Sequence, residues 1–195
     1  MSKIEHPVVS LEEWNKARDE LLQKEKQVTR QHDAVAAELR SLPWVKLTKQ
    51  YVFQTSDGPK TLDELFENNS QLFMYHFMLG EGWKAGCPMC SNWADSYEGM
   101  RIHLPHRDCS FKVVSSAPLD KILEYKKRMG WQFDWVSAAG SEFNYDSGFS
   151  LKDGQTFPAS GAEESSGISC FFKDGNDIYL TYSTTGRVCH WTRNG

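Results

Sequence analysis

The sequence predicts an α/β protein, a three-layer sandwich around a mixed central sheet with a helical arm at its N-terminal end. In the middle of the chain, apolar runs typical of buried strands alternate with segments of helical periodicity, which favours parallel strands covered by helices. Near the end, two strand-like segments at 168–172 and 178–183 flank a short turn and predict an antiparallel hairpin.

The helical arm is predicted over residues 1–43. Ser10 followed by Glu13 has the form of a capping box, which marks the beginning of a helix, and Leu42-Pro43 ends the pattern. Between them apolar residues recur at spacings of three, four and seven: Leu11, Trp14, Leu21, Val28, Val35 and Leu39. We expect this stripe to pack on the following domain or on a second copy of itself, which would make a homodimer.

The main domain is predicted over residues 44–185. Its elements are expected in this order: strands at 44–47 and 51–54, a turn at 56–59, a short helix at 61–67, a buried strand at 72–79, a helix at 91–103, a buried strand at 111–115, a helix at 117–129, a short strand at 133–136, an irregular connection at 138–166, and the hairpin.

Composition narrows the class of function. The 195 residues carry a net charge of −4 without a clustered basic face, so nucleic acid is not an expected partner. The longest apolar run is far short of the ~20 residues of a membrane span, and the N-terminus has no apolar leader. We therefore expect a cytoplasmic protein. In such a reducing compartment, a close cysteine pair is more often catalytic or metal-binding than a structural disulfide.

Cys87 and Cys90 form that pair, between the buried strand at 72–79 and a helix. Functional sites of such folds lie at the carboxyl ends of parallel strands. At the first turn of a helix, unpaired amides and the helix dipole favour a negative charge, and therefore a thiolate at Cys87. Pro88 suits the first helical position, and Cys90 lies one turn further on nearly the same side. This arrangement predicts Cys87 as nucleophile and Cys90 as the thiol that resolves a mixed disulfide.

Other interpretations of the cysteines stay open. The pair could be structural, or could bind zinc together with His103 and His106, which nearly match a zinc-finger spacing. A continuous helix would place His103 roughly 18 Å from Cys90, so we do not expect a metal. The sequence has no phosphate loop or dinucleotide fingerprint, and we expect no other cofactor. The remaining cysteines, and the pair Glu163-Glu164, are given no catalytic role: Cys109 and Cys170 are expected in the core, and Cys189 in an exposed tail.

Three stretches resemble the thioredoxin-like family catalogued as domain of unknown function 899: YHFMLGEGWKAGCPMCSNWADSYEG, SSAPLDKILEYKKRMGWQFDWVSAAGSEFNYDSG and FFKDGNDIYLTYST. The resemblance runs from about Ser10 to Thr185. It implies a thioredoxin fold and a dithiol–disulfide oxidoreductase activity, with Cys87 and Cys90 as the redox pair. The substrate-binding residues would then be Trp83, Pro88, Met89, Gly167 and Ile168.

The sequence departs from thioredoxins and related peroxidases in several places. Gly86 stands where thioredoxins carry a tryptophan, and Gly167-Ile168 where they carry a cis-proline. Glu81 is the candidate for their buried acid, and Lys84 replaces the threonine of peroxidases. Residues 186–195 do not follow the family pattern and are expected to form a divergent or truncated tail.

The predicted function is thiol–disulfide exchange with a protein or small-molecule disulfide, followed by reduction of the pair by an external reductant. Two alternatives accompany it. One is a peroxide-reducing enzyme of the same fold class, in which Cys87 is oxidised to a sulfenate. The other is a non-enzymatic interaction module in which the arm pairs two copies.

Overall fold

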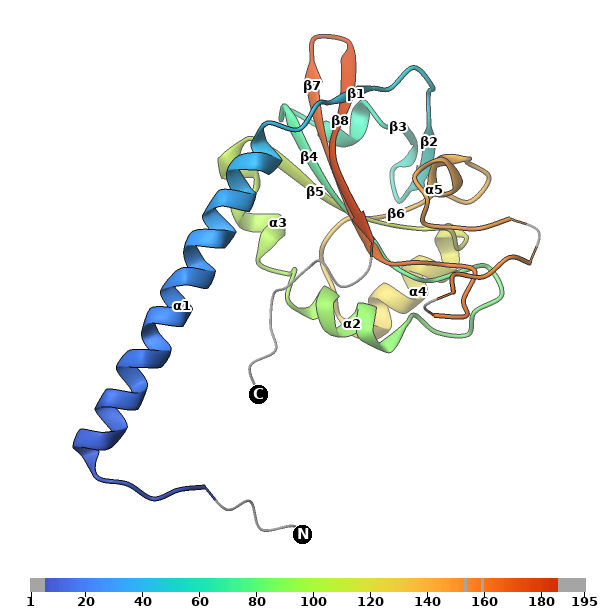
Figure 1. The fold of residues 1–195 in the computed structure, drawn as a ribbon. Coiled ribbons are helices and arrows are strands. Elements are labelled where there is room, and N and C mark those ends of the chain that lie inside the picture. Colours follow the sequence, from blue (N-terminus) through green and yellow to red (C-terminus); the bar gives the residue numbers. More distant parts are fainter. Residues whose placement is uncertain (1–5, 153, 159, 186–195) are drawn as a thin grey trace. The chain divides into compact units, whose positions relative to one another are not determined.

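The computed structural model describes residues 6–152, 154–158 and 160–185 (Figure 1). The chain divides into two compact units, residues 1–42 and 43–195. Within the described residues, no helix has both the length and the apolar character needed to cross a membrane. Cys189 and the tail predicted at 186–195 lie outside the described residues.

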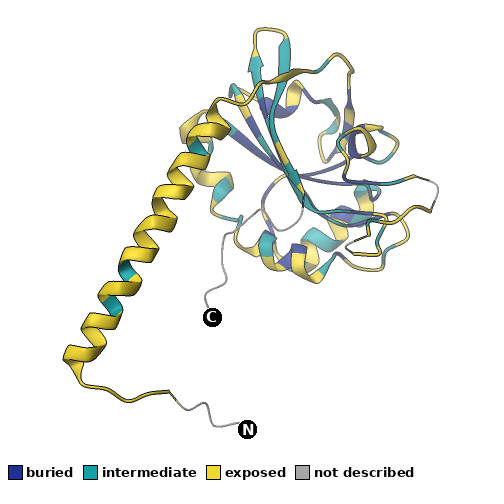
Figure 2. Cartoon of the chain, in the orientation of Figure 1, coloured by how far each residue is buried: buried dark blue, intermediate teal, exposed yellow. Residues whose placement is uncertain are grey.

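The first unit is built on one long helix, α1 (Leu11–Arg40). The capping box forms as predicted: the Ser10 hydroxyl accepts from the Glu13 amide at 3.2 Å, and the Ser10 amide donates to the Glu13 carboxylate at 2.9 Å. Every residue of α1 is exposed or half-buried, as its yellow and teal colour in Figure 2 shows. The apolar stripe of the helix is therefore at its surface.

The second unit contains an eight-stranded mixed sheet with the order β1-β8-β7-β4-β5-β6-β2-β3. At its centre, β4 (Gln71–His76), β5 (Cys109–Ser115) and β6 (Trp135–Ser137) are parallel. The hairpin β7 (Gly167–Asp174) and β8 (Asp177–Thr185) adds antiparallel to β4. The edge strands are β1 (Val45–Lys46) and β3 (Gly58–Thr61), and β2 (Val52–Thr55) lies between β6 and β3. The predicted mixed sheet is confirmed.

Two apolar clusters cover the two faces of the central sheet, because successive side chains of a strand point to opposite faces. Leu72 and Met74 of β4 belong to one cluster, with η1 (Glu64–Phe66) and α5 (Phe143–Asp146). Tyr75 belongs to the other, with α2 (Pro88–Asp95) and α4 (Leu119–Met129). Figure 2 shows the resulting buried centre in dark blue. The three-layer α/β arrangement is therefore as predicted.

The helix predicted at 91–103 is wrong as one element. The structure has α2, then turns at 96–99, then α3 (Met100–His103). The interruption is stabilised from outside the helix: the Asp95 carboxylate accepts the Trp131 indole N–H at 2.8 Å, and the Glu98 carboxylate accepts the Gln132 amide at 2.6 Å. These bonds attach the turn to the segment that leads into β6.

Three smaller predictions also need correction. Gly58 and Pro59 belong to β3 and not to the turn before it. The short helix predicted at 61–67 is only the 3-10 turn η1, although the capping-box bonds between Thr61 and Glu64 form. The connection predicted as irregular at 138–166 contains α5. A second 3-10 turn, η2 (Pro105–Arg107), precedes β5.

Candidate functional site

Cys87 lies at the N-cap position of α2, after the loop that leaves the carboxyl end of β4. Pro88 occupies the first helical position, as predicted, and no side chain of a described residue caps this end of the helix. The Cys87 amide donates to the Met78 carbonyl at 3.1 Å, and the Cys87 carbonyl accepts from the Ser91 amide at 2.9 Å. The main chain around the half-buried Cys87 is thus fixed on both sides at the beginning of α2.

Cys90 is 2% exposed and carries a free thiol, as Cys87 does. Burial is the main reason that the pKa of the Cys90 thiol is raised to about 11. The charge and a hydrogen bond of Cys87 also raise this pKa, whereas hydrogen bonds from the Met78 main chain and the Tyr75 hydroxyl act in the opposite direction. The protonation of Cys90 is therefore linked to Cys87, and Cys87 is the more exposed of the two thiols.

Gly86 explains one departure from thioredoxins. A Cβ at this position would lie 2.5 Å from the Phe77 ring and 2.9 Å from the Tyr125 ring. No side chain, and least of all a tryptophan, fits there without displacing the core. The Tyr125 hydroxyl also lies 3.0 Å from the Ser91 hydroxyl, which links α4 to the first turn of α2.

The predicted substrate-binding residues fall into two groups. Pro88 and Met89 are exposed beside the pair, with Met89 56% exposed. The other three are half-buried: Trp83 in the loop before the pair, and Gly167 and Ile168 at the beginning of β7. Trp83, Ile168 and Cys87 pack against the same apolar cluster.

Gly167 stands opposite His76 in the β4–β7 ladder, and Ile168 opposite Tyr75. A Cβ on Gly167 would lie 2.0 Å from the Thr184 carbonyl oxygen, so the approach of β8 requires a glycine here. The described residues contain no cis peptide bond. The proline of thioredoxins is thus replaced at a position that has no space for a side chain.

Two other residues that the sequence analysis compared with thioredoxins and peroxidases are exposed to solvent. Glu81 lies in the turn after β4, so it does not serve as a buried acid, and Lys84 is exposed in the same loop. Because the helix after the pair is interrupted, the 18 Å separation expected for His103 does not apply. Within the described part of the chain, no group of three or more His, Cys, Asp and Glu side chains could hold a metal ion.

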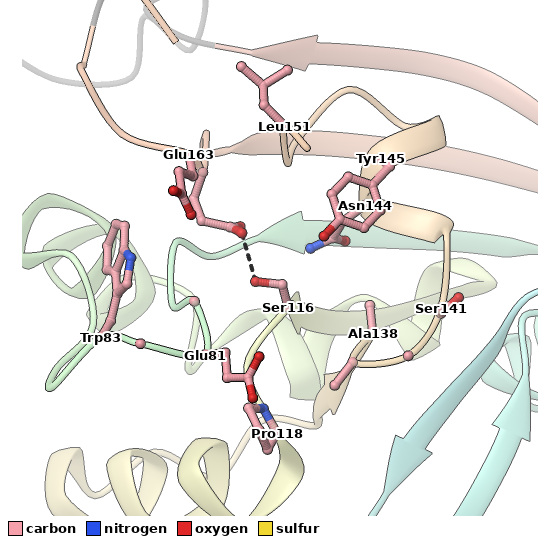
Figure 3. Close-up of a pocket in the computed structure, with 15 residues that line it drawn as sticks. Glu81, Trp83, Ser116, Pro118, Ala138, Ser141, Asn144, Tyr145, Leu151 and Glu163 are labelled. Carbon is pink, nitrogen blue, oxygen red and sulfur yellow. Dashed lines mark hydrogen bonds between the residues drawn. The ribbon is translucent and has the colours of Figure 1, made fainter. Parts of the chain in front are cut away.

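Sequence reasoning missed a cavity of about 640 Å³ that adjoins this site (Figure 3). Its walls come from the segments that follow β4, β5 and β6, and from residues between 140 and 164: Gly80, Glu81, Gly82, Trp83, Ser116, Pro118, Ala138, Ala139, Gly140, Ser141, Asn144, Tyr145, Leu151, Glu163 and Glu164. The small residues after β5 and β6 are the one sequence signal for this space. Trp83 connects the cavity with the apolar cluster that carries Cys87.

Glu164 was interpreted as part of a charged loop, but it is only 7% exposed. Its Oε1 accepts hydrogen bonds from the Ser116 hydroxyl at 2.7 Å and the Ser150 hydroxyl at 3.0 Å. Burial raises the pKa of this carboxyl, although both hydroxyls counteract the rise. Asn144, 3% exposed, has an Oδ1 without a hydrogen-bond partner among the described residues.

His76, at the end of β4, is a further buried polar residue that the sequence did not reveal. It is 1% exposed, stacks on the Phe149 ring at 3.5 Å and lies 2.9 Å from the Ser169 hydroxyl. Burial lowers the pKa of His76 to about 3, so its imidazole is neutral at physiological pH.

The parallel β4–β5–β6 core, the antiparallel hairpin and the cysteine pair at the end of β4 define a thioredoxin-like fold. The chain matches the family described as bacterial protein of unknown function (DUF899) over residues 3–192, and it belongs to that family. No curated protein matches it.

Solved structures support the same fold. A cysteine-to-serine mutant of PrxQ from Xylella fastidiosa superposes with a TM-score of 0.51 at 11% identity, covering 69% of this chain and 77% of its own. A peroxiredoxin-like protein from Aquifex aeolicus gives a TM-score of 0.51 at 12% identity, covering 74% and 76%. At such identities the likeness shows the fold alone.

Proposed function

We propose that the chain is a dithiol–disulfide oxidoreductase in which Cys87 is the nucleophile and Cys90 the resolving thiol. The observation that carries the proposal is the contrast between the two thiols. Cys87 is half-buried at a helix N-cap, whereas Cys90 is 2% exposed with its pKa raised to about 11. The more exposed Cys87 sulfur attacks the substrate first, and the buried Cys90 sulfur reacts only with the mixed disulfide on Cys87.

The exchange balances as follows. The Cys87 thiolate attacks one sulfur of a substrate disulfide, forms a mixed disulfide and releases the first substrate thiolate, which takes up a proton. Cys90 then loses its proton and attacks the Cys87 sulfur, which releases the second substrate thiolate. The substrate gains two electrons and the protein becomes a Cys87–Cys90 disulfide. An external dithiol then supplies two electrons and reduces the Cys87–Cys90 disulfide.

Substrate contacts are proposed at the five predicted positions. Pro88 and Met89 offer an exposed surface beside Cys87, and the methionine side chain adapts to varied apolar partners. Trp83 and Ile168 flank the pair through their shared apolar cluster. Gly167 would contact the substrate through its main chain at the beginning of β7. We place this chemistry in the reducing cytoplasm, where a close cysteine pair is more often catalytic than structural.

A peroxide-reducing activity is the second candidate, because both superposed structures are named as peroxiredoxins or peroxiredoxin-like. In that case, Cys87 would attack a peroxide oxygen and form a sulfenate with release of water or an alcohol. Cys90 would then displace water from the sulfenate and close the disulfide. Both candidates predict the same final Cys87–Cys90 bond, so rates must separate them.

The test uses reduced protein and a small neutral disulfide, bis(2-hydroxyethyl) disulfide, with thiols followed by mass spectrometry. The wild type should release two equivalents of mercaptoethanol and form the Cys87–Cys90 bond. Cys90→Ser should stop at one mercaptoethanol adduct on Cys87, and Cys87→Ser should lose the fast reaction. Cys170→Ser, a half-buried cysteine of β7, is the matched control and should behave as the wild type.

Two results would decide against thiol exchange. One is oxidation of Cys87→Ser at the wild-type rate, because the nucleophile would then lie elsewhere. The other is a second-order rate constant for hydrogen peroxide far above that for the disulfide, which would favour the peroxidase.

We also propose that α1 pairs two copies of the chain. Trp14, Leu21, Val28 and Val35 recur every seven residues and are each 50–54% exposed. A second column of residues, also spaced by seven, lies three positions before the first. It has Leu11 and Leu39 at its ends, and Arg18 and Glu25 between them form an ion pair of 2.9 Å. Two such columns are the a and d positions of a coiled coil, and a second copy supplies the same spacing.

A further inference from the structure

The cavity at the carboxyl ends of β4, β5 and β6 has the size of a small-molecule site. Its volume of about 640 Å³ falls within the roughly 300–1,000 Å³ typical of ligand pockets. Its walls include the apolar surfaces of Trp83, Pro118, Ala138 and Leu151, beside the polar groups (Figure 3). A ligand with a short apolar body and a polar end would match this lining.

The charge of the walls is of one sign. Among the described residues that line the cavity, three are glutamates and none is lysine, arginine or histidine. Lys121 of α4 approaches the same loop, but it donates to the main-chain oxygen of Glu81 at 2.6 Å and is not among the lining residues. Lys152 is paired with Glu142 at 2.5 Å. The charged side chains that line the cavity are therefore all acidic.

Two buried side chains of the cavity, Glu164 and Asn144, can accept hydrogen bonds from a ligand. One oxygen of the buried Glu164 carboxylate accepts hydrogen bonds from both serine hydroxyls, and these bonds orient the carboxylate. Asn144 is an independent observation: it is buried, lines the cavity and has an Oδ1 that no described residue satisfies. In Figure 3 the Asn144 amide and the Ser116 hydroxyl point toward the same open space. Rotation of the amide exchanges its oxygen and nitrogen, so it can present an acceptor to a ligand.

We propose that this cavity binds the ammonium group of a small organic amine. The ammonium would donate to Glu164 and Asn144, and its methylene chain would lie along Trp83, whose ring face also favours a cation. An inorganic cation fits less well, because the described acidic side chains include no cluster that could coordinate a metal. The proposal does not depend on the thiol chemistry of Cys87.

The test is calorimetric titration of the full chain with hexamethylenediamine as the probe. The uncharged analogue 1,6-hexanediol has the same length and should bind at least about tenfold more weakly, as expected for the loss of a charge-assisted hydrogen bond. Glu164→Gln keeps acceptors for both serines but removes the charge, and should weaken diamine binding by about tenfold or more without changing diol binding. Glu124→Gln changes an exposed glutamate of α4 that does not line the cavity, and this variant should bind the diamine as the wild type does.

A second measurement needs no variant. Amide chemical shifts of the wild type, recorded with increasing diamine, should change at residues 80–83, 116, 144 and 163–164. Equal affinity for diol and diamine, unchanged binding by a folded Glu164→Gln protein, or shift changes confined to other surfaces would overturn the proposal. Displacement of the diamine by calcium at equal concentration would also overturn it, in favour of a metal site.

Discussion

At the scale of single residues, Gly86 shows how closely the redox pair is packed against the core. The glycine precedes Cys87, and the Phe77 and Tyr125 rings occupy the space that any side chain would need. Phe77 is itself only 2% exposed, so it has little freedom to move aside. The position of Cys87 therefore depends on a contact of the main chain with an aromatic ring.

Gly86→Ala is expected to lower the free energy of unfolding by about 1–3 kcal/mol, the usual cost of forcing an extra methyl group into a packed core. Gly82→Ala is the matched control in the same loop, because a Cβ there meets no described atom within 4 Å. Its effect should stay within about 0.5 kcal/mol. Urea denaturation measures both. Equal stabilities of the two variants would mean that the Phe77 ring yields easily.

His76 gives a prediction about acid. The folded chain holds this imidazole neutral until pH about 3, because burial lowers its pKa, whereas the unfolded chain protonates it near pH 6.5. Between these values the unfolded state binds the extra proton, so His76 makes stability fall as pH falls. From pH 7 to pH 4 the loss due to this residue is about 3 kcal/mol.

His76→Phe keeps an aromatic ring against Phe149 but cannot be protonated. Its free energy of unfolding, measured in urea at pH 7 and pH 4, should fall by about 3 kcal/mol less than that of the wild type. All other titrating groups are common to both proteins, so their effects cancel in this comparison. An equal loss in both proteins would show that His76 is protonated in the folded state.

The same residues show what a sequence can reveal about a site. The place of Cys87 and Pro88 at the beginning of α2 was predictable because a helix N-terminus is encoded in consecutive residues. Glu164 and Asn144 were missed because their burial depends on segments far away in the chain, such as the serine after β5. A glutamate pair in a polar connection has no local feature that distinguishes a buried acid from a solvated one.

At the scale of elements, local signals predicted the helices and strands better than their ends. The capping box and the sevenfold spacing were sufficient for α1. The helix after Cys90 was predicted too long because its interruption is stabilised by Trp131 and Gln132, more than thirty residues further along. Gly58 and Pro59 were assigned to a turn because glycine and proline are typical turn residues, although their pairing with β2 makes them part of a strand.

The stripe of α1 leads to a prediction on assembly. Val28→Lys places a charge in the middle of the apolar column and should convert a dimer to a monomer, because a buried unpaired lysine is costly. Gln27→Lys, on the neighbouring position outside the stripe, should leave the dimer intact. Sedimentation equilibrium gives the mass in each case. A wild type that remains at the mass of one chain at high concentration would exclude pairing through α1.

At the scale of the whole molecule, the parallel strands bring two different sites to one edge of the sheet. The segments after β4, β5 and β6 line the acidic cavity, and the chain that continues from β4 carries the cysteine pair. Trp83 belongs to both, since it lines the cavity and packs with Cys87 on one cluster. The sequence predicted this edge from the alternation of strands and helices, but not the cavity, whose walls come from five separate segments.

If both proposals hold, the cavity should select among disulfides by charge. Cystamine carries an ammonium group two carbons from its disulfide, and bis(2-hydroxyethyl) disulfide carries a hydroxyl at the same place. The ratio of kcat/KM for cystamine over the neutral disulfide should be about tenfold higher in the wild type than in Glu164→Gln, because the lost charge-assisted hydrogen bond contributes at least about 1.4 kcal/mol. Comparing ratios removes the different intrinsic reactivities of the two disulfides.

Glu124→Gln should keep the wild-type ratio, because its carboxylate lies outside the cavity. An unchanged ratio in Glu164→Gln, together with normal diamine binding to the wild type, would separate the cavity from the thiol reaction. The ammonium would then bind without presenting a disulfide to Cys87. A ratio that falls with Glu164→Gln while the reaction with the neutral disulfide stays constant would instead make Glu164 a specificity residue of the exchange, acting on the far end of the substrate.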